Sequence, residues 1–150
     1  MVIRLIAHRG NIEGDNPDSE NHPEQIEQVV NKFDCEVDLR FKEKSSELFL
    51  GHDGLDYKVE LEWLVNFKER LWIHCKDYAS LNFLSLNNFD LNYFWHQDDD
   101  FTLTSKGYIW TYPMKRVGSK SVIVIKDTKE LNLDCFGVCT NEILKVKDMI

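Results

Sequence analysis

The 150-residue sequence lacks a long apolar run, a cluster of basic residues and a closely spaced cysteine pair. No window approaches the roughly 18 apolar residues that span a bilayer, and the first seven residues are too few for a signal-peptide core. We therefore expect a cytoplasmic protein without stable membrane association. No basic run exceeds Lys115-Arg116 and the net charge is −8. Nucleic acid is excluded as the main partner, because binding its backbone requires clustered cations.

The four cysteines, Cys35, Cys75, Cys135 and Cys139, form no Cys-x-x-Cys pair, the spacing typical of zinc knuckles and redox motifs. Each lies in an apolar or strand-like window, so we interpret them as reduced core thiols, with a scattered metal site as the alternative. Linkers rich in Ser, Gly or Pro are also missing, as are internal repeats. The sequence predicts a single domain over residues 1–150.

Short apolar runs alternate with helical patterns along this domain. Runs rich in β-branched and aromatic residues predict strands over 2–7, 35–39, 48–50, 71–75, 93–95, 108–112, 122–125 and 136–139. Apolar residues at helical spacing predict helices over 22–33, 59–69 and 78–86. This order is typical of parallel βαβ units. Segments 97–107 and 113–120, where further helices belong, are polar and short.

Polar residues that carry chemistry follow several of these strands. His8-Arg9-Gly10 ends the first strand, which is compatible with either a ligand site or a capped loop. Glu36 and Asp38 are two residues apart in a strand, so both project from the same face. Paired carboxylates are tolerated when they are solvated or when a cation lies between them. The sequence therefore predicts either an exposed edge strand or a divalent-metal site.

Two further windows point to the same edge of the sheet. His52-Asp53 lies in a turn after a strand, and His74 and Lys76 share one face of an apolar strand. His74 could be a satisfied core histidine, but a neighbouring lysine is hard to bury without an anion. Nearly all of these residues follow the carboxyl ends of strands, where α/β barrels build active sites.

In this order and spacing the chain resembles the glycerophosphodiester phosphodiesterases of the phospholipase C-like barrel superfamily. The matching motifs cover the chain from end to end: His8-Arg9-Gly10, Glu20-Asn21, Glu36-x-Asp38, His52-Asp53, His74-x-Lys76, Ile109-Trp110-Thr111 and Gly137-Val138-Cys139-Thr140-Asn141. The family has Glu-x-Lys where this chain has His74-x-Lys76. It ends in Thr-Asp where this chain has Thr140-Asn141.

The resemblance implies an α/β fold of the TIM-type (β/α) barrel. Because eight strands usually need about 250 residues, we expect a shortened barrel with an incomplete helical coat and about seven barrel strands. Sheet surface near residues 97–120 would be left bare, and a homodimer through that side would cover it.

The resemblance also implies roles for individual residues. Glu36 and Asp38 would hold a divalent metal ion, Mg²⁺, Ca²⁺ or Mn²⁺, with His74 at the position of a third carboxylate. An imidazole there favours Mn²⁺ or Zn²⁺, unless His74 has lost the ligand role. His8 and His52 would be the general acid and base of catalysis. Arg9 and Lys76 would bind the phosphate, and Glu20 would support Arg9.

Aromatic residues at later strand ends, Trp95, His96 and Trp110, are candidates for the wall of a substrate pocket, although core packing explains them as well. The expected activity is metal-dependent hydrolysis of a small-molecule phosphodiester, a glycerophosphodiester above all, to an alcohol and glycerol phosphate. The alternatives are a relative that releases a cyclic phosphate and a module that binds a phosphodiester without turnover.

Overall fold

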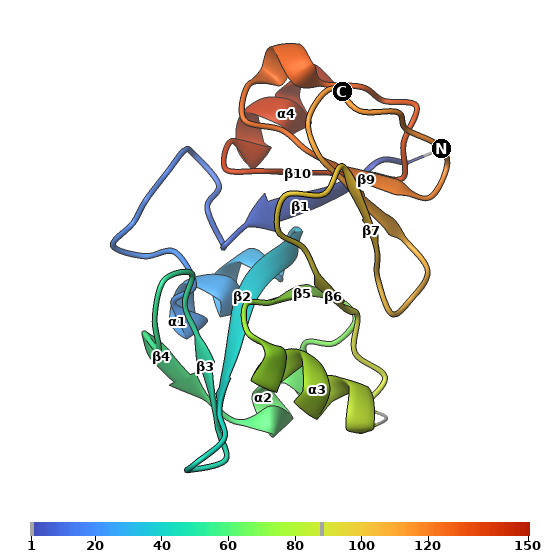
Figure 1. The fold of residues 1–150 in the computed structure, drawn as a ribbon. Helices are drawn as coiled ribbons and strands as arrows, with labels where there is room; N and C mark the ends of the chain where they lie inside the picture. The colour runs from blue at the N-terminus through green and yellow to red at the C-terminus, as the bar shows by residue number, and fades with distance from the viewer. Residues whose placement is uncertain (1, 88) are drawn as a thin grey trace.

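The computed structural model describes residues 2–87 and 89–150, and its main element is a curled mixed β-sheet (Figure 1). Seven of the described strands run parallel, in the order β6 (Tyr93–Trp95), β5 (Leu71–Cys75), β2 (Asp34–Lys42), β1 (Arg4–His8), β10 (Gly137–Thr140), β9 (Ser121–Val124) and β8 (Ile109–Thr111). Antiparallel strands extend it: β3 (Glu47–Leu50) beside β2, β4 (Tyr57–Val59) beside β3, and β7 (Phe101–Leu103) beside β8.

Short helices cover only part of this sheet. They are α1 (Pro23–Val29), α2 (Leu61–Asn66), α3 (Tyr78–Leu86), α4 (Ile143–Met149) and a 3-10 turn, η1 (Thr128–Glu130). Proline in the first turn and buried Ile26 and Val29 explain α1. Asp77 caps α3, because its carboxylate accepts a hydrogen bond from Ser80 N at 2.7 Å. No helix among the described residues is long and apolar enough to cross a membrane.

The predicted TIM-type barrel, shortened and with an incomplete helical coat, is wrong. After β6 the chain forms the antiparallel β7–β8 hairpin instead of a crossover helix, and no ladder within the described residues joins β6 to β8. A parallel crossover needs about a dozen residues, usually with a helix that buries an apolar face. The connection between β6 and β8 is long enough, but its polar segment 97–107 has no apolar helix face to bury. The sheet therefore stays an open, strand-rich half-barrel.

The predicted strands are all present, but four elements were not expected: β4, β7, η1 and α4. The hairpin leaves an apolar face uncovered near residues 97–120, where Phe101 is 45% exposed, Leu103 68% and Ile109 37%. That surface was expected to be bare. The homodimer that would cover it stays a prediction.

The buried apolar residues form three hydrophobic clusters. The largest joins buried residues of β2 and β5 that face the helices, such as Val37 and Ile73, to α1, α2 and α3. The four cysteines are free and buried, as predicted. Burial raises the pKa of the Cys75 thiol to about 12 and also raises the pKa of the other three thiols.

Candidate metal centre and pocket

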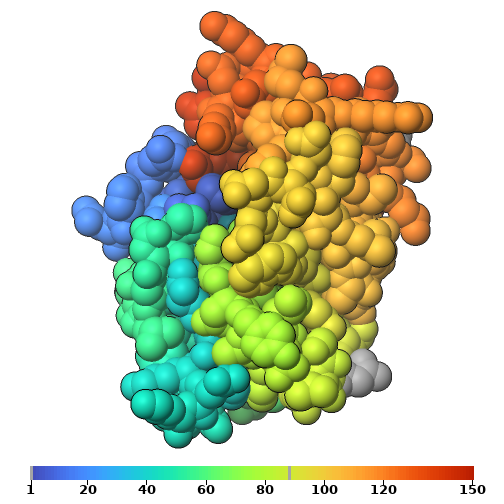
Figure 2. Space-filling view, in the orientation of Figure 1, coloured from blue at the N-terminus to red at the C-terminus, as the bar shows by residue number. Residues whose placement is uncertain are grey.

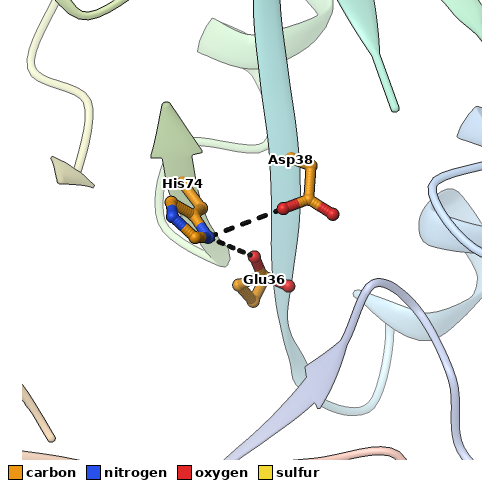
Figure 3. A group of neighbouring side chains, drawn as sticks. All are labelled: Glu36, Asp38 and His74. Carbon is orange, nitrogen blue, oxygen red and sulfur yellow. Dashed lines mark ion pairs between the residues drawn. The ribbon is translucent and has the colours of Figure 1, made fainter. Parts of the chain in front are cut away.

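The register between β2 and β5 brings the acidic pair to a histidine. Asp38 on β2 lies directly opposite His74 on β5, and Glu36 lies opposite Trp72. Because side chains two residues apart share a face of a strand, Glu36 and Asp38 both point to the same side. Figure 3 shows the three side chains of Glu36, Asp38 and His74 directed toward one another.

Three donor atoms converge at this point. His74 Nδ1 lies 3.5 Å from Glu36 Oε1 and 3.5 Å from Asp38 Oδ1. Both carboxylates are 1% exposed, and within the described residues neither of these two oxygens has a hydrogen-bond partner. A buried carboxylate oxygen without a partner is costly. These residues fit a divalent cation, which would bind all three atoms.

The second nitrogen of His74 settles which atom faces the carboxylates. Nε2 lies 2.9 Å from the carbonyl oxygen of His96 and must donate to it, since a carbonyl only accepts. In the neutral ring Nδ1 then carries a lone pair directed at Glu36 and Asp38. A backbone carbonyl that orients the ring in this way is typical of metal-bound histidines.

Nearby charges shift the pKa values of Glu36 and Asp38 in opposite directions. Burial by itself raises the pKa of Glu36. A protonated His74 ring, which donates toward Glu36, outweighs burial together with His8 and Arg9 and lowers that pKa to about 2. Burial and the adjacent Glu36 charge raise the pKa of Asp38 above its usual value, although Arg9 opposes them. One carboxylate is therefore firmly ionised, and the other is short of positive charge.

The loop after β1 wraps around this pair. Arg9 Nε lies 3.2 Å from Asp38 Oδ2, Arg9 N donates to Glu36 Oε2 at 3.1 Å, and Arg9 Nη1 donates to Glu20 Oε1 at 3.3 Å. Arg9 and Asn21 have φ values of 55° and 60°. Such left-handed backbone is uncommon outside glycine and is concentrated at functional sites. The predicted support of Arg9 by Glu20 is present.

His8 is held at the end of β1 by Asn141, which follows β10. His8 Nδ1 lies 2.8 Å from Asn141 Oδ1, and the Asn141 amide in turn donates to Asp15. Because an amide oxygen only accepts, Nδ1 carries the proton and the lone pair lies on Nε2. His8 Nε2 lies 3.8 Å from Glu36 Oε2, beside the metal centre.

His52 approaches the same pocket from the turn after β3. Its Nδ1 lies 2.8 Å from Asp53 Oδ1, and its side chain is 34% exposed. Arg40 on β2 anchors the turn by donating to the carbonyl oxygens of Gly51 and His52. A side chain at Gly51 would collide with the carbonyl oxygen of Gly54, so this tight turn requires glycine.

These groups surround one pocket of about 1060 Å³ at the carboxyl ends of the parallel strands. The predicted site residues that line it are His8, Arg9, Glu20, Glu36, His52, His74, Lys76, His96 and Trp110. In Figure 2 the blue loop after β1 stands at one side of the visible face, and the yellow segment after β6 covers the other. Loop residues 14, 15 and 17 and residues 96 and 97 belong to the lining.

The aromatic candidates take different places. Trp95 does not line the pocket, and its side chain packs against the largest hydrophobic cluster. Trp110 lines it but is only 3% exposed and stacks on Phe94, with ring centroids 4.5 Å apart. Burial lowers the pKa of His96, whose Nε2 donates to the carbonyl oxygen of Asp99 at 2.6 Å. His96 is therefore a neutral residue of the wall.

Sequence reasoning assigned no role to several lining residues. Asn141 orients His8, and Lys126 and Lys145 line the pocket beyond β9 and β10. The only signal for Asn141 was its place in the closing motif. The lysines resembled ordinary surface charges.

No protein-family model matches the chain, and the searches of curated proteins and of solved structures give no match either. The case for a function rests on the geometry of the site. That geometry combines three metal-donor atoms with two histidines, and it adds the cations Arg9 and Lys76 in the same pocket. The combination is suited to polyanionic, phosphate-containing ligands.

Proposed function

We propose that this chain is a metal-dependent phosphodiesterase that hydrolyses a glycerophosphodiester to an alcohol and glycerol phosphate. One observation carries the proposal. Two buried carboxylate oxygens, on Glu36 and Asp38, have no hydrogen-bond partner among residues 2–87 and 89–150. They converge with His74 Nδ1 in a pocket that also contains His8 and His52. When bound, a divalent ion would withdraw charge from a phosphoryl oxygen.

The remaining charge on the phosphate falls to the side chains of this chain. Within the described residues Lys76 makes no ion pair although it lines the pocket, so its ammonium group is free to bind a phosphate oxygen. Arg9 is already held by Glu20 and Asp38, which fixes its guanidinium plane before substrate arrives. Such preorganised cations stabilise charge as it shifts in the transition state.

The two histidines divide the proton transfers. The lone pair on His8 Nε2 accepts a proton from the attacking hydroxyl, because Nδ1 is committed to Asn141. His52 donates a proton to the leaving oxygen, and the Asp53 carboxylate stabilises positive charge on its ring. Hydrolysis forms one P–O bond to water oxygen and breaks one to the alcohol. If a substrate hydroxyl attacks first, a cyclic phosphate precedes the monoester.

Phosphorus NMR tests the proposal directly. Glycerophosphodiesters and one lysolipid are incubated with wild type, His8→Ala and His52→Ala in Mg²⁺, Ca²⁺, Mn²⁺ or EDTA. The matched control is His22→Ala, because His22 caps α1 outside the pocket. We expect metal-dependent monoester or cyclic phosphate with wild type and the control, and a loss of about 100-fold or more in both pocket variants.

Turnover that is indifferent to EDTA or to His8→Ala would overturn the mechanism. A phosphodiester that protects the fold against heat without being consumed would identify the non-catalytic binding module instead. The position of the product peak separates a monoester from a cyclic phosphate, and so names the reaction.

A further inference from the structure

The turn that carries His52 makes few hydrogen bonds of its own. Gly51 N donates to the Asp38 carbonyl oxygen at 3.0 Å, just before the turn. Among the residues that the structure describes, no N–H group of 52–55 donates to another backbone group. A segment with so few internal hydrogen bonds is readily displaced, so its position depends on contacts from elsewhere in the fold.

Arg40 supplies these contacts from β2. Its Nε donates to the Gly51 carbonyl oxygen at 3.0 Å, and its Nη2 donates to the carbonyl oxygen of His52. The two bonds fall on successive peptide groups, one on each side of the His52 backbone. The planar guanidinium fork fits two acceptors at once, which gives it a geometric precision that a single ammonium group lacks.

The side-chain partner of His52 is too exposed to fix the ring. His52 Nδ1 lies 2.8 Å from Asp53 Oδ1, but the Asp53 side chain is 96% exposed. Exposed ion pairs contribute little to holding two side chains in one geometry. The position of His52 in the pocket therefore depends on the backbone that Arg40 holds.

Strand β2 connects this contact to the metal centre. Glu36, Asp38 and Arg40 alternate along the strand, so their side chains leave the same face. The two carboxylates face His74, whereas Arg40 binds the turn and is not among the described residues that line the pocket. One strand therefore sets both the metal donors and the distance of His52 from them.

We propose that Arg40 is a positioning residue, which holds the His52 turn so that the imidazole meets the leaving oxygen of a phosphodiester bound beside Glu36 and Asp38. The inference rests on the proposed function for the role of His52. Arg40 acts through the turn and touches no reacting atom. Its effect on the rate arises because a displacement of about 1 Å in a catalytic group costs up to about 100-fold.

A double-mutant cycle tests the inference. The substrate is the glycerophosphodiester that wild type hydrolyses fastest in the phosphorus NMR panel. We expect Arg40→Met to lower kcat about 10–100-fold, with KM and Mn²⁺ affinity within about twofold of wild type. In the His52→Ala background Arg40→Met should have no further effect on kcat, because a displaced imidazole matters only where the imidazole is present. Arg116→Met is the control, since Arg116 is an exposed arginine outside the pocket.

Amide nitrogen relaxation gives a readout that needs no turnover. In metal-free protein the order parameters of residues 52–54 should fall from about 0.85 to below about 0.6 in Arg40→Met, and stay unchanged in Arg116→Met. Unchanged order parameters in Arg40→Met would overturn the inference. An equal loss of kcat with and without His52, or a change in KM or Mn²⁺ affinity as large as that in kcat, would overturn it as well.

The two measurements also separate this inference from the proposed function. If no glycerophosphodiester is hydrolysed but Arg40→Met still releases residues 52–54, the proposed function fails and the contact that positions His52 stands. If wild type hydrolyses the substrate and the cycle is additive, the phosphodiesterase stands and the positioning role of Arg40 fails.

Discussion

The Asn21 side chain forms two hydrogen bonds with Asp38. Asn21 Nδ2 donates to Asp38 Oδ2 at 2.8 Å, and Asp38 N donates to Asn21 Oδ1 at 2.9 Å. Both residues are 1% exposed. One loop residue therefore satisfies the backbone of β2 and orients the carboxylate, so that the other oxygen of Asp38 faces His74.

Replacing Asn21 tests this contact. Asn21→Ala leaves the Asp38 backbone N–H unpaired, so we expect about 1–3 kcal/mol less stability in urea unfolding and roughly 10–100-fold weaker Mn²⁺ binding by calorimetry. The control is Asn31→Ala, which removes an exposed bond to the Glu27 carbonyl. If Asn31→Ala weakens Mn²⁺ binding as much as Asn21→Ala does, the hydrogen bonds between Asn21 and Asp38 do not contribute to metal affinity.

Exchanging His74 tests the metal preference. An imidazole donor favours Mn²⁺ or Zn²⁺, whereas a third carboxylate favours Mg²⁺ or Ca²⁺. We expect His74→Glu to lower the Mn²⁺ to Mg²⁺ affinity ratio about tenfold, and His74→Ala to weaken binding of every ion tested. Competition calorimetry on metal-free protein measures both effects. An unchanged ion preference in His74→Glu would show that His74 is not a ligand.

The contact between Asn141 and His8 predicts a kinetic defect. Asn141→Ala removes the acceptor of His8 Nδ1, so a fraction of the rings carries the proton on Nε2 instead. We expect kcat to fall about 10–100-fold with little change in KM, and Asn141→Asp to restore an acceptor and much of the rate. Nitrogen NMR of the His8 ring reports the tautomer. A normal tautomer in Asn141→Ala would contradict the assignment.

Buried thiols predict a loss of stability in alkali. The folded pKa of Cys75 is about 12 because of burial, against an ordinary value of 9.0. Between these values the unfolded chain releases a proton that the folded chain retains, so stability is full below pH 9 and falls as pH rises, by about 1.4 kcal/mol per pH unit for this thiol. Urea unfolding from pH 8 to 11 should give a shallower slope in Cys75→Ala. An identical slope would show that Cys75 ionises normally in the folded state.

The bare face of the β7–β8 hairpin predicts self-association. Phe101 and Leu103 are two residues apart on the edge hairpin, and both are exposed. We expect solution scattering to show dimers at high concentration, and the double substitution Phe101→Asp with Leu103→Asp to give monomers. A monodisperse monomer of the wild type would remove the homodimer.

Much of the fold could be read from local patterns. Buried parallel strands are apolar on both faces, so β5 and β10 stand out in the sequence. The β7 strand did not, because Phe101, Thr102 and Leu103 lie in a polar stretch and their strand pairing comes from β8, far from any local pattern. The TIM-type barrel failed as a prediction because the chain after β6 forms the β7–β8 hairpin, so that among the described residues no ladder joins β6 to β8.

The candidate site was also predictable only in part from local sequence patterns. Spacing alone placed Glu36 and Asp38 on one face, and both reach His74 in the structure. Contacts between residues far apart in the chain could not be predicted from any nearby sequence pattern. Asn21 is 17 residues from Asp38, and Asn141 is 133 residues from His8. Pairings at such separations depend on the packed fold rather than on any neighbouring residue.

Asp38 on β2 and His74 on β5 lie opposite each other, so the metal centre forms only when these two strands pair in the correct register. A shift of β5 by one residue would replace His74 by Ile73 or Cys75 opposite Asp38 and turn the imidazole to the other face. Only one alignment of the two strands offers all three donors. An ion would therefore stabilise that alignment over its misaligned competitors, and chains that fold in its presence should reach the native pairing with fewer errors.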